Sequence, residues 1–337
     1  MTSREPLSDR ALASDRASDG VFGATAPRSH AELKAALAEG QLSKPDYIRE
    51  SLSWHRQLFE YVRVVADTEI HEIRITADGV KFRLGDEGAE LYCPPNEARV
   101  APIEIMNFGA YEGAETKLLN ALAAQSKTVL DIGANIGVYS IRLALRFPEL
   151  RVFSFEPIPT SFDYLQRNIA LNAVGERVRA FQYALSDRAG ATTFYIAPHN
   201  GTNASLQNVA SATDALEVPG LMLTLDDWVR SFGVAPDLIK CDVEGGELLV
   251  FQGGFETLRS ERPVVFSELL RKWAKGFGYH PNAVLELFRS LGYRCFAIGD
   301  AGIREIGMVD DETPETNYIF VHPERHPHAI QLLTGEI

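Results

Sequence analysis

The chain has 337 residues, a hydrophobic share of 45% and a formal net charge of −13, a composition typical of a globular protein of one or two domains. The acidic balance disfavours binding to a phosphate backbone, so nucleic acid is not an expected partner. The three cysteines are too widely spaced for a disulfide framework or a zinc site, which favours a reduced, cytoplasmic setting. No apolar run reaches the roughly 18 residues that a membrane span needs.

The N-terminal part of the chain lies outside the main pattern of elements. Residues 1–28 are rich in Ser, Ala, Asp and Arg and lack the apolar core of a signal peptide, so we predict a disordered tail. Residues 29–104 are expected to form an appendage, with helices near 30–63 and antiparallel β-hairpins over 68–93. The apolar stripe of the second helix is expected to pack on the main body, with a substrate-capping or dimerising role as the alternative.

From about residue 113 the pattern alternates between strands and helices, which indicates a parallel sheet covered by helices on both faces. The expected strands lie at 127–132, 151–155, 178–185, 238–242, 264–268, 293–298 and 317–321, with an antiparallel excursion at 190–225. We therefore predict an α/β fold over residues 105–325, a doubly wound, Rossmann-like sheet that is mostly parallel with an antiparallel edge. Residues 326–337 are expected to be a C-terminal tail.

A turn with two glycines and one asparagine follows the first strand of this sheet. Its glycines, Gly133 and Gly137, enclose Ala-Asn-Ile, so the G-x-G-x-x-G spacing of a dinucleotide site is absent. The pattern D-x-G-x-N-x-G resembles motif I of the class I S-adenosylmethionine (SAM) methyltransferases. Asn135 stands where many of them have a middle glycine, and Asn is the non-glycine residue that best tolerates a positive φ.

This turn predicts a cofactor site made of backbone and one acid. We expect Asp131 to accept a hydrogen bond, directly or through water, from the methionine ammonium of SAM. Gly133, Ala134 and Asn135 are expected to bring the backbone against the cofactor, and Gly137 lets the following helix begin without a side-chain clash. A tight turn without any ligand is the alternative.

Two further segments are placed to bind the nucleoside. Glu156 ends the second strand 19 positions after Gly137 and precedes Pro157, and an acid at this place accepts hydrogen bonds from ribose hydroxyls. Leu185, Ser186 and Asp187 follow the third strand, where Leu185 is expected against the adenine ring and Ser186 or Asp187 near its amine. The alternatives are a surface acid and an ordinary polar turn.

Three acids follow the fourth strand, namely Asp242, Glu244 and Glu247. Open α/β sheets place their chemistry at this end of the strands. Desolvation and mutual repulsion raise carboxylate pKa values there, which suits a general base for a hydroxyl nucleophile. Asp242 or Glu244 is the expected base, whereas Glu247 is expected to begin the next helix; acids that only cap this helix are the alternative.

Other polar residues give weaker indications. Glu268 ends the fifth strand, and with Asp242 it could hold a divalent cation, but a third oxygen ligand is missing, so metal is not favoured. Tyr111 and Glu112 enter the first core helix and are expected either to close over the cofactor or to cap the helix. Residues 322–328 contain three histidines without metal-ligand spacing and are expected to form a solvated turn.

Taken together, the chain resembles the FkbM family of SAM-dependent methyltransferases over about residues 105–322. The resemblance rests on the segments Val129–Ser140, Phe155–Pro157, Leu225–Asp227 and Ile239–Gly245. It implies a class I methyltransferase fold and O-methylation of a small-molecule or glycan acceptor, often a sugar hydroxyl or a natural-product scaffold. The acceptor and the oligomeric state do not follow from it. A nicotinamide-dependent oxidoreductase and a non-catalytic SAM-binding protein are the alternatives.

Overall fold

The computed structural model describes residues 28–95, 97–197, 200–207, 215–299 and 302–335. The predicted N-terminal tail therefore lies outside the described residues, except for Arg28. Contacts between residues divide the chain into two compact units, one up to Tyr61 and the other from Val62 onward. Within the described ranges, no helix is both long and apolar enough to cross a membrane.

The first unit is a pair of helices, as expected. Helix α1 (His30–Ala38) begins with a capping box between Ser29 and Glu32, and helix α2 (Lys44–Asp67) follows after a short turn and continues into the second unit. The indole nitrogen of Trp54 donates to the carbonyl of Arg28 at 2.9 Å. Leu52 and Phe59 of α2 are exposed, and the expected packing of the α2 stripe on the main body stays a prediction.

A three-stranded antiparallel meander opens the second unit, formed by β1 (Ile70–Thr76), β2 (Gly79–Leu84) and β3 (Ala89–Tyr92). The hairpins are confirmed, but they are not an appendage separate from the main domain. Their apolar side chains share one core with the helices beside the large sheet. Buried Arg142 of helix α5 (Val138–Arg146) also pairs with Glu69 at 2.9 Å and with Glu87 of the meander.

Asparagine side chains of helix α6 (Pro159–Leu171) and its C-cap complete the outer edge of this meander. The amide oxygen of Asn172 accepts from the Glu90 nitrogen at 2.9 Å, and that of Asn168 accepts from the Tyr92 nitrogen at 2.7 Å. Asn168 is fully buried, and its side-chain nitrogen donates to the carbonyl of Ile136 at 2.9 Å. The meander is thereby connected to the turn after the first core strand.

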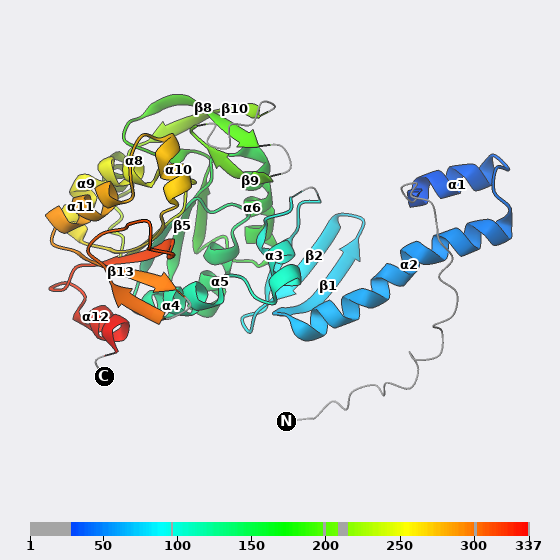
Figure 1. The fold of residues 1–337 in the computed structure, drawn as a ribbon, viewed down its shortest axis with the longest axis horizontal. Helices are drawn as coiled ribbons and strands as arrows, with labels where there is room; N and C mark the ends of the chain where they lie inside the picture. Colours follow the sequence, from blue (N-terminus) through cyan, green and yellow to red (C-terminus); the bar gives the residue numbers. More distant parts are fainter. Residues whose placement is uncertain (1–27, 96, 198–199, 208–214, 300–301, 336–337) are drawn as a thin grey trace. The chain divides into compact units, whose positions relative to one another are not determined.

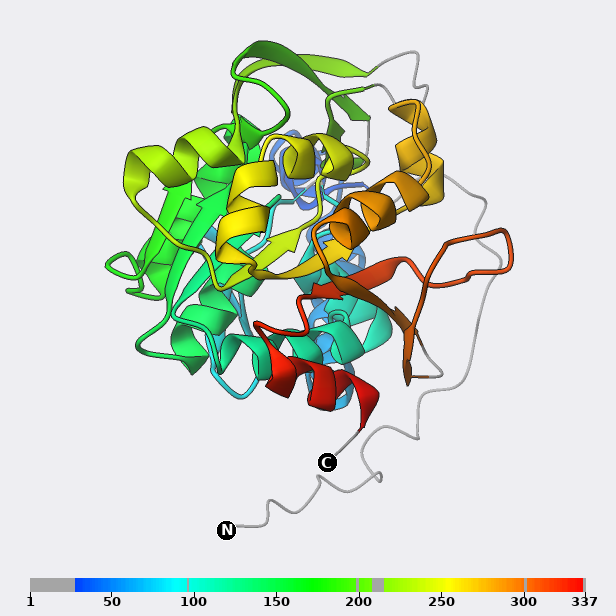
Figure 2. The same cartoon turned by 90° about the vertical axis from the view of Figure 1, so that its left-hand side faces the viewer.

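The large sheet has the strand order β14-β13-β15-β12-β11-β4-β5-β6, and its strands run through the centre of the second unit in Figures 1 and 2. The run from β12 to β6 is parallel, whereas β15 is antiparallel to both of its neighbours. The predicted doubly wound, mostly parallel sheet is confirmed. Its bounds are β4 (Thr128–Ile132), β5 (Arg151–Phe155), β6 (Val178–Phe181), β11 (Leu238–Cys241), β12 (Val264–Glu268), β13 (Arg294–Gly299), β14 (Gly302–Glu305) and β15 (Asn317–Val321).

The antiparallel strands of this sheet differ in one respect from the prediction. The strands expected at 293–298 and 317–321 form the expected antiparallel pair as β13 and β15, but this pair is not the edge of the sheet. The edge is the short strand β14, which the sequence pattern did not indicate because its four residues carry a single large apolar side chain, Ile303.

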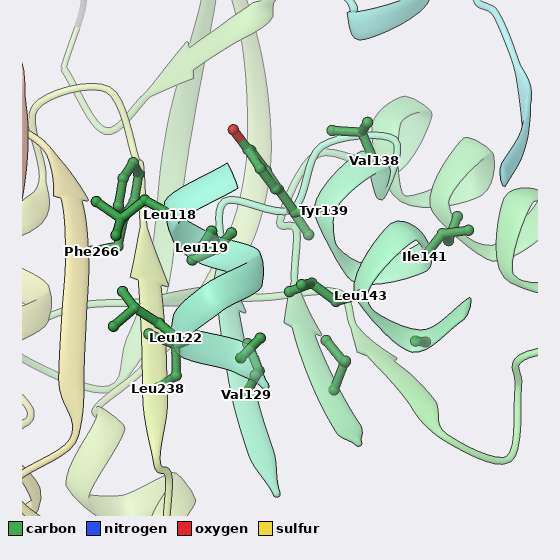
Figure 3. Packing of buried hydrophobic residues seen from close by; sticks show 14 of the residues in the cluster. Leu118, Leu119, Leu122, Val129, Val138, Tyr139, Ile141, Leu143, Leu238 and Phe266 are labelled. Carbon is green, nitrogen blue, oxygen red and sulfur yellow. The ribbon is translucent and has the colours of Figure 1, made fainter. Parts of the chain in front are cut away.

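Helices cover both faces of the sheet and enclose two apolar cores. One face carries α3 (Ala101–Phe108), α4 (Gly113–Ala123), α5, α6 and α12, and Figure 3 shows Leu118, Leu119 and Leu122 of α4 beside Val129 of β4 and Leu238 of β11. The other face carries the remaining helices of the second unit, around Trp228, Phe251 and Phe288. These are α7 (Leu225–Phe232), α8 (Glu247–Gln252), α9 (Phe255–Glu261), α10 (Arg271–Gly276) and α11 (Asn282–Ser290).

A second sheet of order β7-β10-β8-β9 lies beyond β6 in the chain. Its strands are β7 (Ala184–Leu185), β8 (Gly190–Ala197), β9 (Asn200–Ser205) and β10 (Leu216–Leu223). The antiparallel excursion is confirmed, but the single strand expected at 178–185 is divided between the two sheets. The break occurs because residues 184–185 pair with β10, and the Ser186 nitrogen donates to the carbonyl of Leu223 at 2.9 Å.

The C-terminal tail is a correction as well. Helix α12 (Pro327–Thr334) occupies most of it and buries Ala329, Ile330 and Leu333 in the core. This spacing puts the three apolar side chains on one helical face, so the segment packs instead of remaining solvated. His322, which was expected in a solvated turn, is only 5% exposed.

Candidate active site

A cavity of about 410 Å³ opens at the carboxyl ends of β4, β5, β11 and β12. The strand order reverses between β4 and β11, and in open α/β sheets ligands bind at such a reversal. The volume is that of a small-molecule site. Its wall includes Gly133, Ala134, Asn135, Glu156, Leu185, Lys240, Asp242, Glu244, Glu268, Tyr111, Glu112, Tyr139, Phe155, Arg99, Lys272 and Trp273.

The turn after β4 requires the residues that the sequence places there. Asn135 has a φ of 51°, so the predicted left-handed conformation is confirmed. A Cβ atom on Gly133 would lie 1.8 Å from the carbonyl oxygen of Asp242, and one on Gly137 would lie 2.5 Å from Leu165 of α6. Gly133 thus lets the β4 and β11 turns touch, and Gly137 lets α5 begin against α6.

Glu156 is held rigidly at the end of β5. Its carboxylate accepts hydrogen bonds from the backbone nitrogens of Asn135 and Ile158, each at 2.9 Å. The residue is 6% exposed, and burial raises the pKa of Glu156 to about 7 against the opposing effect of these two bonds. Each carboxylate oxygen retains a lone pair, so the group is oriented and still able to accept from a ligand in the cavity.

Asp131 does not lie where the sequence suggested. It is 1% exposed and is not part of the cavity wall. One of its carboxylate oxygens accepts from the Ser140 hydroxyl at 2.5 Å, and the other lies 3.7 Å from the ammonium of Lys240. The oxygen near Lys240 has no hydrogen-bond partner among the described residues, and the expected contact of Asp131 with a cofactor ammonium stays a prediction. Asp131 stabilises the turn from its buried side.

Lys240 is the functional residue that the sequence prediction missed. Its ammonium donates to the Gly133 carbonyl at 3.1 Å and lies 3.4 Å from a carboxylate oxygen of Asp242. Burial lowers the pKa of Lys240, but the carboxylates of Asp242, Asp131 and Glu112 together raise this pKa above its ordinary value. The signal was present in the sequence as one charged residue within the buried strand Leu238–Cys241.

Carboxylates gather on the side of the cavity formed by β11 and β12. Burial and the neighbouring Asp242 charge raise the pKa of Glu244 to about 8 and that of Glu268 to about 9. One carboxylate oxygen of Glu244 is buried with no hydrogen-bond partner among the described residues. Glu244 also has a φ of 55°, a strained conformation for this residue. The predicted raising of carboxylate pKa values after the fourth strand is confirmed.

The segment before α4 closes another side of the cavity. Glu112 accepts a short hydrogen bond from the Tyr139 hydroxyl, and the rings of Tyr111 and Tyr139 lie 5.8 Å apart. Burial and the Asp242 charge raise the pKa of Glu112, while the Tyr139 bond opposes this. Glu112 makes no side-chain hydrogen bond that caps α4, so the structure favours the cavity role over the capping role for this segment.

Glu247 has the structural role that was expected of it. It is the first residue of α8, and one carboxylate oxygen accepts from the backbone nitrogens of Val243 at 3.1 Å and Gly245 at 3.0 Å. Its other oxygen accepts from the Tyr279 hydroxyl at 3.1 Å. Glu247 therefore shapes the loop that presents Asp242 and Glu244.

The segment predicted to flank adenine is only partly in the cavity. Leu185 lines it and is buried. Ser186 and Asp187 are not in the cavity wall: the Ser186 hydroxyl donates to Asp187 at 3.2 Å, and Asp187 pairs with Arg188. Gly253 packs so closely here that a Cβ on it would lie 2.0 Å from the Ser186 carbonyl oxygen. Of the three residues predicted to flank the adenine, only Leu185 lies in the cavity wall.

The residues present fit SAM better than a metal ion. The oriented carboxylate of Glu156, the exposed backbone of the β4 turn and the apolar Leu185 match a ribose diol, a polar amino-acid moiety and an adenine ring. For a metal, no group of three or more His, Cys, Asp or Glu side chains is arranged to hold an ion in the part of the chain that the structure describes.

Comparison with known proteins agrees with this geometry. Residues 131–295 match the family model of the methyltransferase FkbM domain. Methyltransferase sdnD of Sordaria araneosa is 31% identical over 153 residues, covering 37% of this chain and 59% of the relative. The 2-O-methyltransferase NoeI of Sinorhizobium fredii is 30% identical over 162 residues (43% and 65%), and the hexuronic acid methyltransferase AglP of Haloferax volcanii is 31% identical over 154 residues (44% and 59%).

Each of these alignments spans less than two thirds of the relative. The matched residues 131–295 contain the glycine turn, Glu156, Lys240 and the acids after β11 and β12. Residues 131–295 are therefore similar to the methyltransferase FkbM domain, as the sequence resemblance indicated.

Proposed function

We propose that this protein is a SAM-dependent O-methyltransferase that acts on a hydroxyl of a saccharide or of a secondary metabolite. The observation that carries the proposal is the arrangement of two kinds of carboxylate around one cavity. Glu156 is bonded to two backbone amides beside the glycine turn, whereas Glu244 and Glu268 lie opposite with raised pKa values. The similarity to the hexuronic acid methyltransferase AglP supports a sugar-derived acceptor, and that to the 2-O-methyltransferase NoeI supports transfer to oxygen.

The β4 and β5 side of the cavity would hold SAM. Glu156 would accept hydrogen bonds from both ribose hydroxyls, since its two oxygens are fixed by the amides of Asn135 and Ile158. The backbone at Gly133 and Ala134 would approach the amino-acid moiety, and Leu185 would contact the adenine. Lys240 would hold the backbone of the β4 turn in position through its hydrogen bond to the Gly133 carbonyl.

The β11 and β12 side would hold the acceptor and take its proton. SAM supplies an electrophilic methyl group when it is bound. Asp242 or Glu244 would accept the hydroxyl proton as the oxygen attacks, and Glu268 and Glu112 would orient the acceptor by accepting from its other hydroxyls. The pKa of Glu244, about 8, is close to the pH at which a general base works well. Most of the rate would come from holding the oxygen in line with the methyl group.

We also propose a cytoplasmic location and a small-molecule or glycan acceptor rather than nucleic acid. Cys93, Cys241 and Cys295 are all free thiols, which suits a reducing compartment. The carboxylates on the acceptor side would repel a phosphate backbone.

Two measurements test the proposed function. Calorimetry with SAM and its demethylated product should show binding to the purified full chain, and NAD should not bind; binding of NAD without SAM would favour an oxidoreductase instead. Methyl-labelled SAM is then incubated with a panel of neutral sugars, amino sugars, uronic acids and phenolic metabolites, and products are identified by mass. Binding of SAM without transfer to any acceptor would favour a non-catalytic SAM-binding protein.

A further inference from the structure

Helix α2 carries large apolar side chains that the other described residues leave exposed. The exposed fractions are 56% for Ile48, 46% for Leu52, 73% for Phe59 and 67% for Val62. Leu58 on the flank is 53% exposed. Single exposed apolar residues are ordinary, but a continuous row of them marks an interaction surface.

The row has the spacing of a coiled-coil seam. Ile48, Leu52, His55, Phe59 and Val62 follow one another at intervals of four, three, four and three residues, and we call these five residues the α2 seam. This is the alternation of a and d positions in a heptad, which keeps a stripe facing a partner helix. The 24 residues of α2 extend over about 36 Å, enough for the seam to pair along its length.

The first unit has a small core in the part that the structure describes. Its described part, residues 28–61, buries only Leu33, Ala36 and Ser51. Chains of fewer than about 40 residues usually need a disulfide, a metal or association to fold, and an isolated helix is marginal in water. This described part contains no cysteine and no group of metal-ligating side chains, so association through α2 would add stability that these contacts do not supply.

We propose that the α2 seam is a dimer interface and that its partner is the α2 seam of a second copy of this chain. A seam with heptad spacing fits another helix of the same spacing, and identical copies supply one. Between Lys44 and Asp67 four basic and four acidic side chains cancel, so the helix has no net attraction for an anionic membrane surface. The single polar seam residue, His55, would fix the register of the pair.

The test compares two variants that add the same negative charge to opposite sides of α2. Phe59→Glu places the charge in the seam, and Gln57→Glu places it on the far side, at an exposed position. Sedimentation of the full chain over a concentration series should give a dimer for the natural sequence and for Gln57→Glu. Phe59→Glu should raise the dissociation constant of the dimer by about tenfold or more. Phe59 is 73% exposed, so both variants should unfold at similar temperatures as dilute monomers.

The results of these measurements distinguish a second copy of the chain from a membrane as the partner of the α2 seam. A natural protein that stays monomeric at every concentration overturns the proposal, as does a dimer that Phe59→Glu leaves intact. Monomers that bind anionic phosphatidylserine vesicles through the seam would assign it to a membrane instead. The seam includes no residue of the cavity wall, so SAM binding by the variants checks the proposed function independently.

Discussion

Both sides of the cavity contain glutamate carboxylates, but these carboxylates differ in their hydrogen bonding. On the β5 side, the Glu156 carboxylate has a backbone amide bonded to each oxygen. On the β11 and β12 side, Glu244 has an oxygen without a hydrogen-bond partner among the described residues, and it shares the cavity with Asp242 and Glu268. An oriented carboxylate suits the recognition of a fixed partner, whereas a poorly compensated one gains most from taking up a proton. In the proposed function, local bonding rather than residue type would separate binding from proton transfer.

The largest expected effect is on the proton-transfer side. Asp242→Asn keeps the shape of the side chain but removes a base and its charge, so turnover should fall by about 10²–10⁴-fold, while SAM affinity should change little. Rates with labelled SAM and calorimetry on the same preparation measure the two quantities. Asp163→Asn, at an exposed position on α6, is the control. Full activity of Asp242→Asn would assign the base role to Glu244.

The residue that contacts both sides of the cavity should matter most for stability. Lys240→Met leaves the buried carboxylate of Asp131 and the nearby Asp242 without their cation. Breaking a buried pair in this way costs about 3–5 kcal/mol, so the free energy of unfolding in urea should fall by that amount. Lys275→Met, at an exposed position of α10, should have almost no effect. An unchanged urea midpoint for Lys240→Met would show that the lysine is not the link between the two sides.

A smaller effect is expected on the binding side. Glu156→Gln retains one acceptor oxygen but turns an amide group toward a backbone N–H, and it removes the charge that strengthens bonds to the ribose. Affinity for SAM should fall by roughly 10–100-fold, the value of one or two charge-assisted hydrogen bonds. Glu149→Gln, just before β5 and exposed, removes the same charge at the other end of the strand and should bind normally. Equal affinities for the two variants would remove Glu156 from the cofactor site.

A further expected effect is a dependence of the free energy of unfolding on pH. The pKa values of Glu156 and Glu247 are raised to about 7, that of Glu244 to about 8 and that of Glu268 to about 9, mainly by burial. The folded protein therefore holds protons that the unfolded chain releases above about pH 4.5. The free energy of unfolding should fall as pH rises from about 5 to 9. Glu268→Gln should reduce this slope in urea titrations at several pH values, and an identical slope would contradict a raised pKa at Glu268.

Local requirements made part of the site predictable from sequence. Gly133, Asn135 and Gly137 stand where the backbone needs a positive φ or a close approach, and such needs depend on neighbours in the chain. Glu156 was also predictable, because the length of one helix connects it to the turn. The alternation of strands and helices from β4 to β12 defined the sheet for the same reason.

Contacts between distant segments were not predictable in this way. The pairing of Lys240 with Asp131 depends on β4 and β11 being neighbours, although they are about 110 residues apart in the chain. The inclusion of the meander in the main unit depends on Arg142 meeting Glu69 and Glu87. Helix α12 was mistaken for a tail because eight residues carry too little periodicity to distinguish a packed helix from a solvated end.

Asn168 has a consequence for the production of a shorter protein. Its side-chain oxygen accepts from the Tyr92 nitrogen of β3, and its side-chain nitrogen donates to the carbonyl of Ile136, one residue beyond Asn135. A protein trimmed to the matched residues 131–295 would expose this side chain and remove one support of the turn after β4. A shorter version that keeps this turn intact should therefore start upstream of β1, because the meander stabilises the turn.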